Sequence, residues 1–277
     1  MALFMALSVF KKDTWVNMGY KSDKEAIMFK RISSKLVAAF AITTLIAISI
    51  VITLTTITYS RQKTKAHEDV SKAELLLQEL IEVKKSDAIS IAANYAGDSR
   101  IVEALSSDSR AEMQAFTVPV FTTFSELNGL AVFEVGDSTG KVFFRAHNPD
   151  KYGDDKHELK SIAMTLEGNR LAGTETGSSG IAIRAFAPIM KGEKVIGTLQ
   201  TGYSGDFFES FKKLSSVEIE VFDHEKMLFS TVAGQTAALK DLPENEQSQL
   251  TQSLGGKAFE ATSGEYIYRY LPIEDPS

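Results

Sequence analysis

The sequence predicts an α+β protein in which an N-terminal membrane helix and a long stalk helix precede two antiparallel-sheet domains, the second incomplete. Three observations support this fold class. An uncharged apolar run lies near the N-terminus, a long helical pattern follows it, and β-rich segments separated by turns then occur twice in a similar order. The chain has 277 residues, of which 44% are hydrophobic and 24% charged, as in folded proteins of one or two domains.

The net charge of −6 is unevenly distributed along the chain. Residues 1–35 hold seven Lys and Arg against three acidic residues, and residues 36–60 hold no charge, so residues 61–277 carry −10. An acidic main body argues against nucleic acid as a partner, because nucleic acid needs a basic face. The absence of cysteine excludes disulfides, thiolate metal sites and c-type haem attachment.

Residues 36–60 form the predicted transmembrane helix, because about 20 apolar residues are enough to span a bilayer. The run is too long for a signal sequence and no small-residue cleavage site follows it, so it should remain as an anchor. Lysine is abundant before it, which places residues 1–35 in the cytoplasm. We therefore expect a single span in the inner membrane, with the bulk of the chain periplasmic or extracellular.

The N-terminal residues 1–27 do not resemble a folded element, whereas Met28 begins a compact basic lead to the anchor. We hypothesise that translation starts at Met28 and that residues 1–27 are not translated. N-terminal sequencing of the expressed protein that found Met1 intact would contradict this.

The stalk segment, residues 61–110, is expected to be one long helix over 62–105. Apolar residues recur every three or four positions from Val70 to Tyr95, and no proline interrupts them. Two interpretations stay open, namely a core helix of a globular domain and a stalk that docks a sensor and pairs with a second copy. Both can hold, because one stripe can pack on a sheet at one end and on a partner helix at the other.

Two successive sheet domains follow the stalk, over residues 111–214 and 215–277. The first should contain strands 130–135, 141–147, 181–188 and 195–203 with helices 158–166 and 206–214. The second should contain strands 217–222, 227–232, 257–261 and 265–272 with a helix over 242–254. No closing strand follows the last of these, so we expect a fragment or a gene cut short.

This order of elements resembles the double Cache module, a PAS-like extracellular sensor of chemoreceptors and sensor kinases, over roughly residues 36–277. The residues that carry the resemblance are VFFRAHNPDKYGDD (142–155), TLEGNR (165–170), IAIRAFAPI (181–189) and KVIGTLQTGY (194–203). The resemblance implies a transmembrane receptor for a small extracellular solute, first of all a methyl-accepting chemotaxis protein. A sensor histidine kinase or diguanylate cyclase receptor, and an anchored binding protein without an output domain, are the alternatives.

Strand alternation selects the candidate ligand-binding residues. Phe143, Arg145 and His147 share one face of their strand, and the apolar residues between them should pack on the long helix. Arginine and histidine together suit an anion, since the guanidinium group matches a carboxylate. By analogy with carboxylate-binding Cache sensors, the expected ligand residues are Arg145, His147, Arg184, Phe143, Thr201 and Tyr203. The alternative is that both arginines pair with acidic loop residues such as Asp154 and Asp155.

Signatures of catalysis are missing from the sequence. Its four histidines form no H-E-x-x-H pair, and Thr174 stands where a P-loop would need lysine. We therefore expect no enzyme activity, no catalytic residue, no metal and no cofactor. The expected partners are a small-molecule ligand and a second copy, which would dimerise through the long helix and the transmembrane helix.

Overall fold

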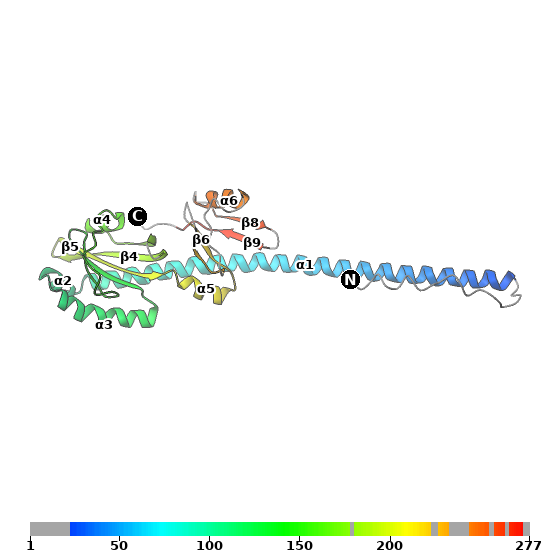
Figure 1. Cartoon of the computed structure of the whole chain (residues 1–277), viewed down its shortest axis with the longest axis horizontal. Helices are drawn as coiled ribbons and strands as arrows, with labels where there is room; N and C mark the ends of the chain where they lie inside the picture. The colour runs from blue at the N-terminus through cyan, green and yellow to red at the C-terminus, as the bar shows by residue number, and fades with distance from the viewer. Residues whose placement is uncertain are drawn as a thin grey trace. The chain divides into compact units, whose positions relative to one another are not determined.

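The computed structural model describes residues 23–177, 180–222, 227–232, 244–254, 258–263 and 266–273. The chain divides into two compact units, Met1–Lys65 and Ala66–Ser277. Helix α1, Asp23–Ala96, begins in the first unit and ends in the second (Figure 1). Its first turn corrects the expectation that nothing before Met28 is folded, whereas residues 1–22 lie outside the described part of the chain.

The first unit contains the apolar part of α1. Within the described residues one helix is long and apolar enough to cross a membrane, with a mean hydropathy of 2.5 in its most apolar window. Threonine hydroxyls in this part donate to carbonyl oxygens of the preceding turn, as from Thr44 to Phe40 and from Thr55 to Val51, both at 2.8 Å. These hydroxyls therefore find partners without water, which lipid surroundings require.

In the second unit the expected single helix is broken after Ala96. Asp98 caps a separate helix by accepting a hydrogen bond from the backbone N–H of Arg100 at 3.0 Å. A further helix follows that the sequence analysis did not predict, and it ends at Gly129, whose φ of 74° suits glycine. The two helices are α2, Ser99–Ser106, and α3, Arg110–Asn128.

A five-stranded antiparallel sheet in the order β2-β1-β5-β4-β3 forms the centre of the second unit. Its strands are β1 Val132–Asp137, β2 Val142–Arg145, β3 Leu171–Gly177, β4 Gly180–Lys191 and β5 Lys194–Ser204. Four of these strands confirm the sequence prediction, while the edge strand β3 was not expected. The short helix α4, Lys160–Leu166, confirms the predicted helix before Gly168.

One face of the sheet packs on α1, and α2 and α3 lie on the same side (Figure 1). Small residues of α1, Ala88 and Ala92, have no exposed surface and let the helix approach the strands closely. Large side chains of the strands fill the space between them, including Phe133, Phe144 and Leu199. Each such fully buried side chain stabilises the fold by about 1.5–3 kcal/mol, so this cluster fixes α1 on the sheet.

In the described part of the chain, six elements follow β5. They are α5 Phe207–Ser215, β6 Glu220–Phe222, β7 Met227–Ser230, α6 Glu244–Leu254, β8 Phe259–Ser263 and β9 Tyr266–Tyr270. Two antiparallel pairs, β6 with β7 and β8 with β9, confirm the predicted strands, and the predicted turn at 223–226 lies outside the described residues. A second apolar cluster joins Phe208 and Val221 of this region to Ala73 of α1 and Ile181 of β4.

We expect Ala88→Leu to destabilise the protein by about 1–3 kcal/mol, because overpacking a filled core forces side chains and backbone apart. The matched control is Ala111→Leu, since Ala111 is exposed on α3 and its replacement should change stability by less than about 0.5 kcal/mol. Urea unfolding of both variants measures the difference. Equal stabilities would contradict the close packing of α1 on the sheet.

Candidate functional site

The outer face of the sheet, turned away from α1, is polar and yet buried. It is formed by strand residues that alternate with those facing α1. They are Glu134 on β1, Arg145 on β2, Arg184 and Phe186 on β4, and Thr198, Gln200 and Gly202 on β5. Helix α4 contacts β4 and β5 and covers part of this face. A buried surface with this many polar groups is typical of a binding site rather than of a structural core.

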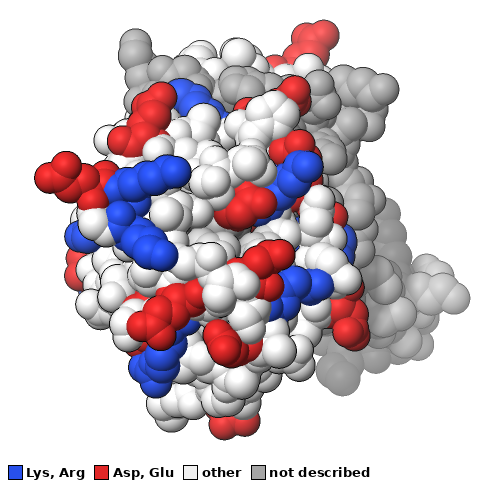
Figure 2. Space-filling view, turned by 90° about the vertical axis from the view of Figure 1, so that its left-hand side faces the viewer, with Lys and Arg blue, Asp and Glu red and all other residues white. Residues whose placement is uncertain are grey.

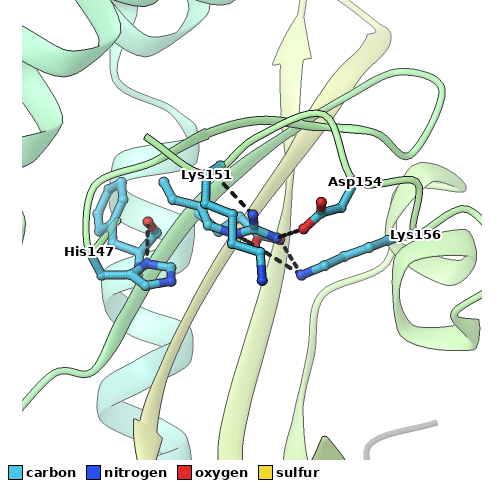
Figure 3. A network of polar contacts seen from close by, with 7 residues as sticks. His147, Lys151, Asp154 and Lys156 are labelled. Carbon is cyan, nitrogen blue, oxygen red and sulfur yellow. Dashed lines mark hydrogen bonds and ion pairs between the residues drawn. The ribbon is translucent and has the colours of Figure 1, made fainter. Parts of the chain in front are cut away.

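Glu134 lies at the centre of this face, with its side chain only 5% exposed. Its Oε2 accepts a hydrogen bond from Arg145 Nε at 2.7 Å, and Lys156 Nζ lies 2.7 Å from Oε1 and 2.9 Å from Oε2 (Figure 3). A buried carboxylate is costly unless cations and hydrogen bonds compensate for lost hydration. Here two cations converge on one carboxylate, which satisfies it.

Arg145 is fully engaged by the protein itself. Besides Glu134, its Nη2 donates to Asp154 at 2.6 Å and its Nη1 donates to the Lys151 carbonyl oxygen at 2.9 Å (Figure 3). The hydrogen bond from Arg145 also holds the pKa of Asp154 below its usual value. For Arg145, though not for Arg184, the structure therefore has the pairing with an acidic loop residue that was the alternative prediction. Arg145 ties the loop that contains Lys151 and Asp154 to the sheet.

Arg184 differs from Arg145 because part of it has no partner. Its Nη1 atom is buried and forms no hydrogen bond within the described part of the chain. The side chain lies over Gly202 of β5, where an added Cβ would meet Arg184 Cδ and Nη1 at 3.0 Å. On the other side Gly173 of β3 is opposite Arg184. Glycine on both neighbouring strands leaves the guanidinium group room on the sheet surface.

The three basic residues singled out from the sequence, Arg145, His147 and Arg184, surround one carboxylate. Burial acts to lower the pKa of all three, and the negative charge of Glu134 acts in the opposite direction. The net pKa shift is upward for Arg145, which hydrogen-bonds to Asp154 and Glu134, and downward for His147 and Arg184. For His147, burial is the largest cause of the lowered pKa, and it favours the neutral imidazole. The structure therefore brings these residues together, although their contact with a ligand stays a prediction.

His147 also serves a structural purpose at the edge of this group. Its Nδ1 lies 3.2 Å from the carbonyl oxygen and 3.3 Å from the backbone nitrogen of Phe133. The ring packs near Phe121 of α3, with ring centroids 6.1 Å apart. These contacts leave Nε2 as the ring atom available for other interactions.

Phe143 does not face the proposed pocket, so this part of the prediction is wrong. Strand β2 has a register shift opposite Val135 and Gly136, which interrupts the alternation of side chains. Phe143 consequently joins Phe144 in the apolar cluster against α1. Val142 was expected on the same face of the strand as Phe144. It lies on the other side of the register shift, opposite Gly136.

Thr201 and Tyr203 were also predicted as ligand contacts, and the structure places them on the opposite face. The Thr201 hydroxyl donates to the Ala88 carbonyl oxygen of α1 at 2.7 Å. The Tyr203 hydroxyl donates to the Asp87 carboxylate of the same helix. Central strand β5 is buried on both faces, so alternation alone could not tell which face would meet the ligand.

Glu134 and Lys156 are the site residues that the sequence analysis missed. A signal for Glu134 existed, because it is the one charged residue in the apolar segment LAVFEV and a buried charge needs partners. Lys156 had no such signal, since it follows two aspartates in a loop. Three cations, Arg145, Lys156 and Arg184, thus act on the one carboxylate of Glu134.

Replacing Glu134 with Gln should destabilise the protein by about 3–5 kcal/mol, because two buried or half-buried cations lose their common carboxylate. Glu126→Gln is the control, since Glu126 is exposed on α3. Thermal unfolding at pH 7 compares both with the parent. A Glu134→Gln variant as stable as the control would show that the charge network contributes little.

Solved structures with the same fold support the architecture. The sensor domain of the V. cholerae histidine kinase DctB is 12% identical, with a TM-score of 0.53, and the match covers 79% of this chain and 89% of that one. The extracellular domain of the histidine kinase vpHK1S-Z8 is 13% identical, with a TM-score of 0.53 and coverage of 74% and 84%. A domain of a sensory box/GGDEF family protein from Vibrio parahaemolyticus is 12% identical, with a TM-score of 0.52 and coverage of 74% and 88%.

At these identities the structural likeness shows the fold alone. A search of curated protein sequences gave no significant match. The family comparison is more informative, because the dCache_3 family, described as the double sensory domain of two-component sensor kinase, matches residues 63–277. That range includes both sheet domains and confirms the resemblance to a double Cache sensor. The chain therefore belongs to the dCache_3 family of double sensory domains.

Proposed function

We propose that this chain is the extracytoplasmic sensor of a transmembrane signalling receptor and that it binds a small anion, such as a carboxylate, at Arg184. The observation that carries the proposal is the buried guanidinium nitrogen without a hydrogen-bond partner in the described residues. A buried nitrogen of a charged group that lacks a hydrogen bond is unfavourable, and an anion that accepted a hydrogen bond from it would recover the lost interaction. Three cations, Arg145, Lys156 and Arg184, act on the Glu134 carboxylate, which supports the same sign of ligand charge.

Recognition of the anion would be local rather than a property of a large charged surface. On the face drawn in Figure 2, basic and acidic side chains are interspersed and no broad area of one sign is visible. Such a surface gives little long-range steering, so affinity would depend on the groups around Arg184. The mixed surface and the acidic sequence also disfavour nucleic acid as a partner.

Signalling would follow from a difference in ligand affinity between two arrangements of the sensor. Strand β5 carries Gly202 under Arg184 on one face and contacts α1 through Thr201 on the other. A small shift of β5 would therefore change the position of α1, which continues as one helix toward the apolar segment. The proposed setting is the inner membrane, with the sensor in the periplasm.

The proposal also concerns the kind of output domain that the receptor controls. The family description and two of the similar structures come from kinases, which favours a sensor histidine kinase over the chemotaxis receptor that the sequence resemblance put first. The similar domain from a GGDEF family protein is consistent with the alternative of a diguanylate cyclase receptor. In every case this chain would itself be non-enzymatic, and an anchored binding protein without output is the remaining alternative.

Dimerisation through α1 is a further part of the proposal. Leu76 and Val83 are seven residues apart, and each is more than half exposed in the second unit. Residues seven apart lie on one side of a helix, so the two form the start of an apolar seam. A second copy of α1 would cover it, as the stalk interpretation of the sequence requires.

Arg184→Met should weaken binding of the recognised anion by roughly tenfold to a hundredfold, the value of a charge-assisted hydrogen bond. Calorimetry on the full chain in detergent, with acetate, lactate, succinate, sulfate and phosphate as probes, measures this. Arg170→Met is the control, because Arg170 is exposed beyond α4. The proposal fails if no probe binds the parent, or if Arg184→Met binds as well as the control.

Val83→Cys should form a disulfide-linked dimer in membranes after mild oxidation. The chain contains no cysteine, so the introduced residue alone can react, and a disulfide requires Cα atoms within about 7 Å. Ala111→Cys, on the exposed side of α3, provides the control and should crosslink much less. Equal crosslinking at both positions, or none at Val83, would argue against a dimer through α1.

A further inference from the structure

A second polar group on the outer face has no partner, and it is not among the residues that sequence analysis selected. Gln200 of β5 is only 6% exposed. Its amide group forms no hydrogen bond within the described part of the chain. A glutamine amide can donate two hydrogen bonds and accept two more, so this amide is available to a bound molecule.

The neighbours of Gln200 explain why the protein does not satisfy this amide. Directly opposite it are Glu134 on β1 and Phe186 on β4. The Glu134 carboxylate is already occupied by Arg145 and Lys156, and the phenyl ring of Phe186 offers no hydrogen bond. Gln200 is therefore held on the outer face with its hydrogen-bonding capacity unused.

The position of Gln200 relative to Arg184 suits a shared ligand. The Arg184 side chain lies over Gly202, and Gly202 and Gln200 are successive residues on the same face of β5. Two residues along a strand correspond to about 7 Å. One short organic acid can span this distance, with its carboxylate on Arg184 and a second polar group on Gln200.

We infer that Gln200 is a specificity-determining residue that binds an uncharged hydroxyl or carbonyl group of the anion held by Arg184, so that the ligand class is short hydroxy or oxo acids. This inference rests on the proposed function, since it takes Arg184 as the carboxylate site. An ammonium group in that position is disfavoured, because the carboxylate opposite Gln200, that of Glu134, already has two cations, Arg145 and Lys156, within 2.9 Å. A plain fatty acid would leave the amide unpaired.

Three acids with the same carbon skeleton separate these possibilities: propionate, lactate and alanine. Calorimetry on the full chain in detergent should give a dissociation constant for lactate roughly tenfold below that for propionate, the value of one matched hydrogen bond. Alanine should bind more weakly than lactate. In Gln200→Met, which keeps the side-chain length and removes the amide, lactate and propionate should bind about equally.

The controls distinguish a wrong residue from a wrong site. Gln252→Met replaces an exposed glutamine of α6 and should keep the preference for lactate, while Arg184→Met should weaken binding of both acids. Thermal unfolding verifies that Gln200→Met is folded. The inference is overturned if the parent does not discriminate, if Gln200→Met retains the discrimination, or if alanine binds best.

Failure of the inference and failure of the proposed function give different results. Binding of sulfate, phosphate, acetate or succinate that requires Arg184, without any preference for lactate, would leave the anion site in place and remove the role of Gln200. Absence of binding by every acid and inorganic anion would remove both.

Discussion

The arrangement of the outer face depends on one buried carboxylate, that of Glu134. Arg145 and Lys156 reach the interior of the domain because this carboxylate balances them, and Arg145 in turn binds the loop through Lys151 and Asp154. A charged group buried in this way is tolerated only when its partners are close and well oriented. The loop conformation therefore follows from where a single acidic side chain lies on β1.

The opposite face of the sheet obeys a different constraint, which is close approach. Ala88 and Ala92 have small side chains at the positions of α1 where the strands contribute large ones. Polar groups on this face form hydrogen bonds within the protein. Tyr203 donates to Asp87, and Lys84 lies 4.0 Å from the centre of the Tyr203 ring. Lys84 also donates to the Asn128 carbonyl oxygen at the end of α3. These polar groups are paired within the protein, in contrast to Arg184 Nη1 and the Gln200 amide on the outer face.

The sequence predicted the strands of both sheet domains because period-two alternation and turn residues mark them strongly. It missed α3, whose apolar residues do not form a regular stripe and which contains Pro119, and the edge strand β3, which is rich in glycine and threonine. Among the site residues, Arg184 could be found because a charged residue interrupts an apolar strand. The face on which Phe143 lies could not be predicted, because a register shift interrupts the alternation of β2. The faces of Thr201 and Tyr203 could not be predicted either, because β5 is buried on both sides.

The alternation along residues 200–203 of β5 has a thermodynamic consequence. Gln200 and Gly202 lie on the face of the proposed ligand site, whereas Thr201 and Tyr203 donate hydrogen bonds to α1. A displacement of this segment would therefore alter both the proposed site and the contacts with α1. Coupling of this kind is reciprocal. If ligand binding shifts the equilibrium toward one position of α1 by a given factor, then holding α1 in that position raises the affinity for the ligand by the same factor. The lipid or protein surroundings of the anchor would thereby set the concentration range in which the sensor responds, without any change to the binding residues.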